Sequence, residues 1–289
     1  MNHQPLLNLR APAKINWFLL VLARRKDGYH DINSLMQYVS LYDDLLFYSA
    51  SSLQVICDSE IPPEDNLVYK AASLLQKYAS CRKGIKIILH KNIPTSAGLG
   101  GGSSDAASTL LGLNTLWGLG LKKRELAAMG LEIGSDVPFF LNGPSALIQG
   151  RGEGITHMDF DSSMTLLLVK PPVSVSTAWA YKSVKKLTKK TIDIKLFCRA
   201  FDERDFGSLS NMLKNDLEKI VVKEYPVVGK IKNGLLEQGS VLSAMSGSGP
   251  TVFGVFESTA NASSAAREFG EHWCRVVTTV TKEKLSAKR

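Results

Sequence analysis

The first ninety residues alternate between strand-like apolar runs and short polar breaks. The run 9–22 is mostly apolar and predicts a buried strand, and Asp27-Gly28 after it predicts a turn. Further strand-like runs cover residues 34–41, 44–48, 53–57 and 85–89. Residues 66–78 instead carry apolar side chains at helical spacing, which predicts an amphipathic helix between the last two of these strands.

The rest of the chain mixes helical and strand-like spacing. Helices are expected at residues 105–117, 122–133, 176–187, 194–201, 206–212, 216–218, 227–238 and 262–273, and strands at 146–150, 164–170, 241–245 and 251–256. Residues 137–141 fit either the start of a helix or a strand. Because hairpins come early and crossovers late, this order predicts an α+β fold of two domains, 1–155 and 156–289.

Composition narrows the class of protein. The chain has 289 residues, of which 44% are hydrophobic and 21% charged, as is usual for a globular protein. No apolar run approaches the roughly 18 residues that a membrane span needs, and residues 1–5 lack the pattern of a signal peptide. The four cysteines are scattered without a C-x-x-C pair, so we expect no disulfide framework, no zinc site and a cytoplasmic location.

Part of the net charge of +8 comes from a lysine cluster. Such a cluster binds nucleic acid in some proteins, whereas in others it is a solvated helix face or attracts a polyanionic small molecule. We favour the solvated face and expect neither a nucleic-acid nor a membrane partner. The cluster comprises Lys182, Lys185, Lys186, Lys189, Lys190 and Lys195.

A glycine-rich segment carries the strongest chemical signal. Four of the five residues 98–102 are glycine, and Ser103 and Ser104, which are good N-cap residues, precede a helical pattern. Free backbone amides and the positive end of a helix dipole would then face one point, which favours a bound phosphate. The spacing fits neither the Walker A motif nor G-x-G-x-x-G. The alternative is a flexible turn, which needs one or two glycines rather than four.

Three separated segments resemble the GHMP kinases, a family named from galactokinase, homoserine, mevalonate and phosphomevalonate kinases. Residues 11–16 resemble the first motif of the family, residues 94–107 its glycine-rich loop, and Ser246-Gly247-Ser248-Gly249-Pro250-Thr251 its third motif. Within the family, residues 27–30, 34–37, 134–140 and 150–153 resemble the branch that phosphorylates a cytidine-diphosphate-linked methylerythritol. The resemblance covers about residues 9–256, with the motifs in order.

The resemblance implies a two-domain α+β fold, with an N-terminal domain of a type shared with a ribosomal protein and a ferredoxin-like C-terminal domain. It implies transfer of the γ-phosphoryl group of ATP to the 2-hydroxyl of that substrate, in the non-mevalonate isoprenoid pathway, with Mg²⁺ screening the polyphosphate. One alternative is another GHMP kinase of the mevalonate or homoserine type. A basic nucleic-acid-binding module is a more distant alternative. We expect a monomer or a weak homodimer.

The glycine-rich loop would cradle the ATP phosphates. Other members often carry Met-Gly-Gly at residues 95–97 and Asn at position 105. Asp105 is an acid close to the loop, so it would either repel phosphate or help to position Mg²⁺, and the sequence leaves both open. The implied ATP-binding residues are Pro94, Thr95, Ser96, Ala97, Gly98, Leu99, Gly100, Gly101, Gly102, Ser103 and Ser104.

Lys14 and Asp136 are the candidate catalytic residues. Lys14 lies in an apolar run where an unpaired ammonium is costly to bury, so it needs an anionic partner, for which Asp136 is the candidate. The alternative for Lys14 is an edge-strand lysine whose ammonium reaches solvent. Asp136 precedes Val137-Pro138, which fits a helix N-cap. The resemblance implies instead that Asp136 accepts the proton of the substrate hydroxyl.

The remaining candidate residues would bind the substrate. By resemblance, Tyr29 and Tyr181 stack on the cytosine ring and His30 hydrogen-bonds its edge, with Trp179 a weaker alternative to Tyr181. On sequence grounds alone, a Tyr-His pair after a turn is usually an ordinary surface feature. The full substrate-binding set is Asn16, Tyr29, His30, Thr177, Tyr181, Gly247, Ser248 and Gly249.

Overall fold

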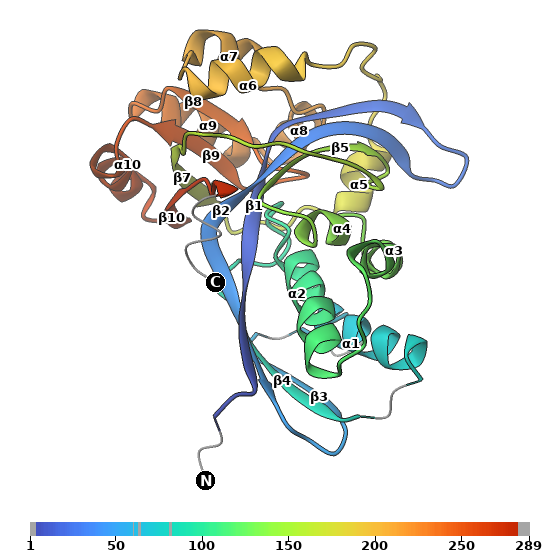
Figure 1. Cartoon of the computed structure of the whole chain (residues 1–289). Helices are drawn as coiled ribbons and strands as arrows, with labels where there is room; N and C mark the ends of the chain where they lie inside the picture. Colours follow the sequence, from blue (N-terminus) through green and yellow to red (C-terminus); the bar gives the residue numbers. More distant parts are fainter. Residues whose placement is uncertain (1–3, 60, 63–64, 81–82, 283–289) are drawn as a thin grey trace. The chain divides into compact units, whose positions relative to one another are not determined.

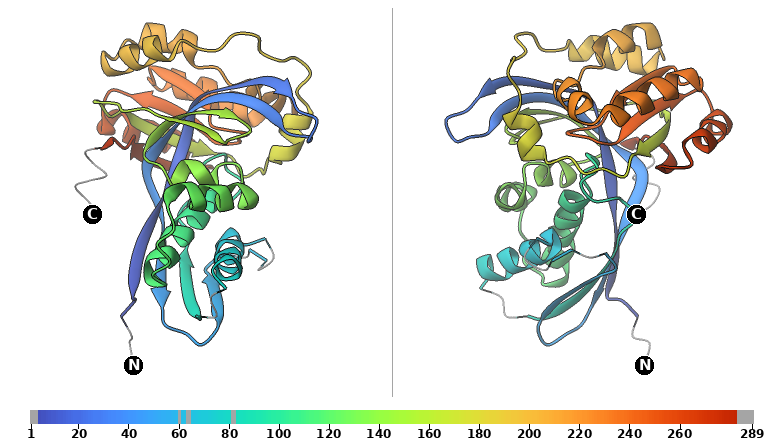
Figure 2. Two further views of the ribbon diagram at one scale, coloured as in Figure 1. Left: turned by 45° about the vertical axis from the view of Figure 1, so that its right-hand side comes forward. Right: turned by 180° about the vertical axis from the view of Figure 1, so that it is seen from behind.

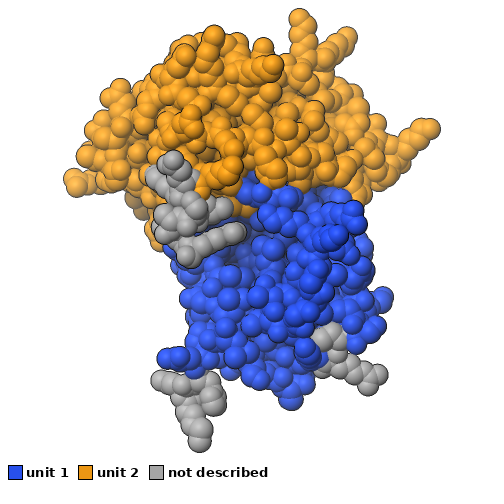
Figure 3. All heavy atoms as spheres, viewed as in Figure 1, with its two compact units in different colours: residues 1–13, 41–95, 100–143 blue, residues 14–40, 96–99, 144–289 orange. Residues whose placement is uncertain are grey.

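The computed structural model describes residues 4–59, 61–62, 65–80 and 83–282, and its contacts divide the chain into two compact units. Unit 1 comprises residues 1–13, 41–95 and 100–143, and unit 2 comprises residues 14–40, 96–99 and 144–289 (Figure 3). These units are interleaved along the chain, whereas the sequence predicted two consecutive segments. The difference arises because the first two strands are long enough to run through both units.

Those two strands are β1 (Leu7–Arg24) and β2 (His30–Tyr48), which pair with each other. The predicted strand at 9–22 is thus present and longer. The runs predicted as separate strands at 34–41 and 44–48 form one continuous strand. The polar residues between the two predicted runs do not end β2. The strand pairs with a neighbour on either side of them, through residues 32–37 with β5 and through residues 44–48 with β4.

Unit 1 places four helices beside a small sheet (Figure 1). Strand β4 (Ile85–His90) runs antiparallel to the last residues of β2 and parallel to β3 (Leu53–Cys57). Helix α2 (Gly101–Leu116) packs against α1 (Leu67–Tyr78), α3 (Lys123–Ile133) and the short α4 (Val137–Phe140). Helix α1 begins where predicted, because the Asn66 side chain accepts a hydrogen bond from the amide of Val68.

Unit 2 contains a four-stranded antiparallel sheet in the order β10-β7-β9-β8 (Figures 1 and 2). Its strands are β7 (Thr165–Lys170), β8 (Leu242–Met245), β9 (Val252–Phe256) and β10 (Trp273–Thr278). A hairpin of β5 (Ser145–Gly150) and β6 (Gly154–His157) pairs with β2. The helices are α5 (Thr177–Lys182), α6 (Ile194–Asp202), α7 (Phe206–Met212), α8 (Glu218–Glu224), α9 (Pro226–Glu237) and α10 (Thr259–Ala266), with a 3₁₀ turn at Arg267–Phe269.

Both faces of the four-stranded sheet are buried. Val252 and Phe256 of β9 join an aliphatic core with α8, α9 and α10. Phe253, which points to the opposite face because side chains alternate along a strand, meets Trp17 of β1 edge-on at 5.5 Å between ring centroids. Trp17 also meets Phe201 of α6 at 5.2 Å. Strands and helices thus form the predicted α+β fold.

Several predicted boundaries are wrong, among them that of the helix expected at 216–218, because α8 begins only at Glu218. The helix expected at 176–187 ends at Lys182, and beyond it the amide of Thr188 donates to the carbonyl of Val21 at 2.8 Å instead of to a helical carbonyl. The helix expected at 262–273 ends early, and β10, which was not predicted, begins at Trp273. Helix α2 starts at Gly101, four residues before the predicted start at 105. None of the helices in the described ranges is long and apolar enough to cross a membrane.

Candidate active site

The glycine-rich loop leaves the start of α2 open. Gly98 and Gly100 have φ values of 74° and 71°, which strongly favour glycine, and Gly100 occupies the N-cap position. No side chain caps the helix, so its first amides have neither intrahelical nor side-chain partners. Ser103 and Ser104 lie inside the first turn and not at the cap. The loop therefore presents uncapped amides, as the phosphate-binding prediction requires.

Within unit 2, residues 96–99 of this loop are fastened to the third glycine motif. The Ser246 hydroxyl donates to the Gly98 carbonyl at 3.0 Å, and the amide of Thr251 donates to the Ala97 carbonyl at 3.3 Å. A β-carbon on Gly98 would lie 2.2 Å from the Ser246 carbonyl oxygen. Two motifs that lie about 150 residues apart in the sequence are thus in direct contact, and the contact leaves no room for a side chain at position 98.

Lys14 also contacts residues 96–99 of the loop, within unit 2. Its side chain is buried, its amide donates to the Leu99 carbonyl at 2.9 Å, and its Nζ donates to Asn16 Oδ1 at 2.6 Å. Asn16 in turn donates through Nδ2 to the Ser34 hydroxyl at 2.8 Å. The interpretation of Lys14 as an edge-strand lysine that reaches solvent is therefore wrong. A fixed, buried ammonium suits contact with an anion.

The third motif, residues 246–251, forms a tight loop over this lysine. Gly247 has a φ value of 56°, and a β-carbon there would lie 3.2 Å from Lys14 Nζ. The Ser248 hydroxyl is 2.8 Å from that of Thr177. The Asn215 side chain donates to the carbonyls of Met245 and Gly247, at 2.9 and 2.8 Å. Asn215 was missed at the sequence level, because a single asparagine between helical segments carries no signal.

Asp136 lies in unit 1, immediately before α4. It occupies the N-cap position, but its backbone is helical and its side chain makes no capping hydrogen bond. A side-chain cap is therefore not its role. A β-carbon on Gly134 would lie 3.6 Å from Ser103 Oγ, so the segment that carries Asp136 runs beside the first turn of α2. Lys14 belongs to unit 2, and its pairing with Asp136 remains a prediction.

The substrate-binding candidates His30 and Tyr181 are brought together in unit 2. Their ring centroids lie 5.6 Å apart. His30 is buried, and its Nε2 has no hydrogen-bond partner in the described part of the chain. Burial, together with the positive charge of Arg24, lowers the pKa of His30, so the ring is neutral at neutral pH. A neutral imidazole without a partner is suited to recognising a polar base edge.

The other two aromatic candidates have different surroundings. Tyr29 is half exposed at the β1–β2 turn, and the Arg151 guanidinium lies over its ring at 4.9 Å. Trp179 packs edge-on against Tyr225 at 6.0 Å, as part of the unit 2 core. Tyr181 also packs against this core, and of the two aromatic side chains it is the one whose ring lies beside His30.

The surroundings of Asp105 fit neither of the two roles considered for it, repulsion of phosphate or positioning of Mg²⁺. Its carboxylate accepts a hydrogen bond from Lys91 Nζ at 2.7 Å, and both side chains are almost fully buried. The ammonium offsets the negative charge that would otherwise repel phosphate. Among the described residues, no group of three His, Cys, Asp or Glu side chains is arranged to hold a metal ion.

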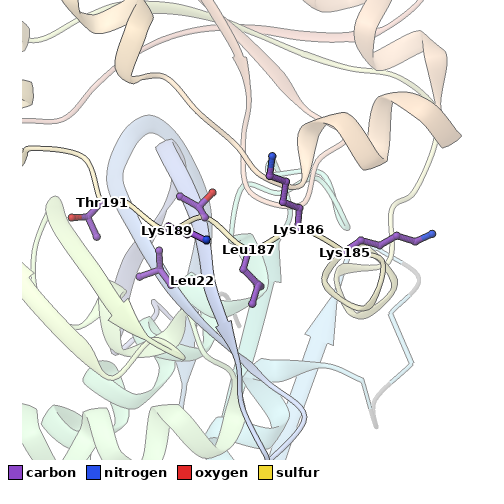
Figure 4. A pocket seen from close by; sticks show the side chains of 7 residues that line it. Leu22, Lys185, Lys186, Leu187, Lys189 and Thr191 are labelled. Atoms are coloured by element: carbon purple, nitrogen blue, oxygen red, sulfur yellow. The ribbon is translucent and has the colours of Figure 1, made fainter.

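A surface hollow of about 670 Å³ lies elsewhere in unit 2 (Figure 4). It contains no predicted site residue, and three of the clustered lysines line it. Those lysines are exposed, and since α5 ends at Lys182 they lie on an irregular segment and not on the helix face that was expected. The lining residues are Leu22, Lys185, Lys186, Leu187, Thr188, Lys189 and Thr191.

Comparisons with known proteins agree with these motifs. Residues 66–144 match the family of GHMP kinases N terminal domains, and residues 195–273 match that of GHMP kinases C terminal domains. A 4-diphosphocytidyl-2-C-methyl-D-erythritol kinase of Thermodesulfovibrio yellowstonii is 46% identical over 95% of this chain and 98% of its own length. The kinase of the same name from Geobacter metallireducens is 43% identical over 90% of this chain and 93% of its own length.

Solved structures give the same answer. A crystal structure of 4-(cytidine 5'-diphospho)-2C-methyl-D-erythritol kinase superimposes with a TM-score of 0.81 at 32% identity, covering 94% of this chain and 99% of that one. The mevalonate kinase of L. major superimposes with a TM-score of 0.72 at 15% identity over 96% of this chain and 99% of that one, which shows a shared fold alone. The chain therefore belongs to the GHMP kinases and, among them, to the family of 4-diphosphocytidyl-2-C-methyl-D-erythritol kinases.

Proposed function

We propose that this chain transfers the γ-phosphoryl group of ATP to the 2-hydroxyl of 4-diphosphocytidyl-2-C-methyl-D-erythritol, as a step of the non-mevalonate isoprenoid pathway. The observation that carries the proposal is the position of the segment before Asp136 beside the first turn of α2. This position supports Asp136 as a base near the open end of the phosphate loop. The family relationship supplies the identity of both substrates.

In this proposal the two glycine motifs and Lys14 handle the transferred group. The uncapped amides of residues 100–103 hold ATP phosphates, since a helix N-terminus favours negative charge. The Lys14 ammonium, fixed by Asn16, stabilises charge on the transferring phosphoryl group. Asp136 orients the 2-hydroxyl and accepts its proton. Most of the catalysis then comes from positioning and charge stabilisation.

Mg²⁺ would be held with little help from protein ligands. The described residues contain no carboxylate cluster that could bind it, and Mg²⁺ commonly keeps water and substrate phosphates as most of its ligands. The hydroxyls of Ser103 and Ser104 are the protein oxygens that the first turn of α2 offers. When bound, the ion screens the negative charge of the polyphosphate.

Recognition of the cytidyl group is assigned to His30 and Tyr181. The ring of Tyr181 provides a stacking surface, and the unpartnered Nε2 of His30 provides a polar contact for the base edge. Tyr29 would add a second stacking surface when Arg151 moves from its ring. A cytoplasmic location and a monomeric or weakly dimeric state remain predictions.

The experiment is to measure ADP release with three acceptors. We expect turnover with the cytidyl substrate and none above background with mevalonate or homoserine. Turnover with mevalonate or homoserine, and none with the cytidyl substrate, would contradict the proposed acceptor while leaving the kinase family intact.

A further inference from the structure

A buried network of three charged side chains lies beneath the start of α2. Lys91 Nζ donates to Asp43 Oδ2 and, at 2.7 Å, to Asp105 Oδ2. The exposed fractions of the three side chains are 7% for Lys91, 0% for Asp43 and 3% for Asp105. All three residues belong to unit 1. Long-chain ion pairs at a surface contribute little to stability, but a buried network fixes the groups that it connects.

The network connects the chain segments on either side of the glycine-rich loop. Asp43 Oδ1 accepts hydrogen bonds from the amides of Asn92 and Ile93, at 2.6 and 2.8 Å, and so holds the segment that leads into the loop. Asp105 lies in the first turns of α2, directly after the loop. Lys91 joins the two carboxylates and therefore sets the distance between the two ends of the loop.

The packing around Gly101 supports the same conclusion. A β-carbon on Gly101 would lie 2.9 Å from Ile93 Cγ2 and 3.2 Å from Lys91 Nζ. The first helical residue of α2 thus rests on the segment that Asp43 holds, with no spare room. A shift of Lys91 or of Asp105 would move the amides that the loop presents.

The two carboxylates of the network differ in how well their charges are stabilised. With all three groups ionised, two carboxylates would share one ammonium in a buried place. Burial raises the pKa of Asp105 to about 7, although Lys91 acts in the opposite direction, and the charge of Asp43 adds to the effect of burial. Asp43, with two amide donors and Lys91, is the better-satisfied carboxylate, whereas Asp105 Oδ1 has no hydrogen-bond partner among the described residues. Asp105 is therefore the less firmly held carboxylate. Its hydrogen bond with Lys91 connects the network to α2, to which Asp105 belongs.

We propose that Lys91, Asp43 and Asp105 are positioning residues for ATP, because they hold the glycine-rich loop with its amides in the geometry that binds phosphate. None of the three is assigned a contact with ATP. The inference rests on the proposed role of the loop in ATP binding. It adds that ATP binding by the loop depends on the buried hydrogen bond between Lys91 and Asp105.

The test removes the hydrogen bond between Lys91 and Asp105 and leaves the ion pair of Lys91 with Asp43, whose charges cancel. Asp105→Ala keeps the pair of Lys91 with Asp43, and Asp105→Asn keeps an oxygen that accepts from Lys91. We expect Asp105→Ala to weaken binding of a non-hydrolysable ATP analogue roughly 10- to 100-fold, since misplacement by about 1 Å has effects of this order. Asp105→Asn should stay within about threefold of wild type, and the affinity for the cytidyl substrate should stay within about twofold in both variants.

A matched control lies at the other end of the same helix. Lys83 Nζ donates to the carbonyl of Trp117, which follows α2, at 3.2 Å. Lys83→Met should leave the affinity for the ATP analogue unchanged. Hydrogen exchange of the loop amides in the ATP-free protein should be faster in Asp105→Ala than in Lys83→Met. Asp105→Ser, whose side chain is too short to reach Lys91, serves as the second link-breaking variant if the alanine variant is unstable.

Three results would overturn the inference. One is an Asp105→Ala or Asp105→Ser protein that folds and binds the ATP analogue as wild type does. The second is equal weakening of both ligands, which would mean a general loss of structure. The third is the same loss in Lys83→Met as in Asp105→Ala. Failure of the wild-type protein to bind the ATP analogue at all would instead contradict the proposed function, on which this inference rests.

Discussion

His30 and Tyr181 lie with their ring centroids 5.6 Å apart and their planes inclined by 31°. They come from the start of β2 and from α5, which are separated by about 150 residues in the sequence. A ring that stacks accepts any base, whereas a polar atom at the base edge discriminates between bases. In the proposed base pocket, Tyr181 would supply affinity for the base and His30 the specificity for it.

We expect His30→Ala to weaken binding of the cytidyl substrate and to reduce the preference for cytosine over uracil. The loss should correspond to about 1–3 kcal/mol, the cost of leaving a buried polar group unpaired. Competition binding with the cytidine and uridine forms of the substrate measures it. Tyr181→Ala is the comparison, since it should weaken both forms about equally. Unchanged base preference in His30→Ala would place the base elsewhere.

Asp136→Asn should lower kcat strongly while KM for both substrates changes little. General-base contributions are roughly 10²–10⁴-fold, and the side chain makes no capping bond whose loss would disturb α4. Steady-state kinetics with saturating ATP and cytidyl substrate checks this, with circular dichroism to confirm folding. Near-normal turnover in a folded Asp136→Asn protein would contradict the assignment of the base.

Gly98→Ala should abolish the loop geometry, because its β-carbon would lie 2.2 Å from the Ser246 carbonyl oxygen and its φ value of 74° disfavours any side chain. We expect ATP affinity to fall at least roughly tenfold, as in other cases where a bound group is misplaced. Titration calorimetry measures the affinity. Gly118→Ala is a control with a similar φ value of 67° but open space around the added carbon. If both variants bind ATP equally well, the contact with Ser246 has no part in the site.

The stability of the protein should depend on the titration of Asp105. Its pKa is raised from 3.8 to about 7 in the folded protein, where Lys91 and Asp43 are its charged neighbours, so the folded state keeps a proton that the unfolded state has lost. This contribution to stability is complete below the unfolded pKa and is lost as the pH rises through about 7. Urea unfolding of wild type and Asp105→Asn should show the free energy of unfolding of wild type falling, relative to the variant, as the pH rises through this window. A constant difference would mean that Asp105 does not titrate there.

Asn215→Leu should lower kcat/KM and also lower the stability of the protein. Its side chain holds the carbonyls of Met245 and Gly247, and Gly247 adjoins the Lys14 ammonium. Leucine would lose these two hydrogen bonds and also the one that Asn215 Oδ1 accepts from the Leu217 amide at 3.0 Å, at a cost of about 0.5–1.5 kcal/mol each. Kinetics combined with thermal unfolding distinguishes the two effects. Full activity in a destabilised variant would limit Asn215 to a structural role.

The sequence predicted those parts of the fold that depend on local pattern. The strand at residues 9–22 and the helix at 66–78 have clear apolar periodicity, and both are present. The start of α2 was placed four residues late, because Gly101 and Gly102 have poor helix propensity and carry no apolar side chain that would extend the helical pattern. Strand β10 was missed, since helical spacing before it continued into Trp273.

The candidate site was predictable where it lies in short motifs. The glycine-rich loops, Lys14 and the pair of His30 and Tyr181 followed from motifs and from resemblance. The Lys91 network could not be predicted, because Asp43 and Lys91 are 48 residues apart and each looks like an ordinary surface charge. Only the folded chain shows that both are buried.

The course of the chain between the two units has a consequence for how the protein could be altered. The boundaries at residues 13, 40, 95, 99 and 143 mean that neither unit is a continuous stretch of sequence. No single cut separates them, so recombination at one position cannot exchange one unit for that of a relative. An exchange of one whole unit would need matched crossovers at several of these boundaries.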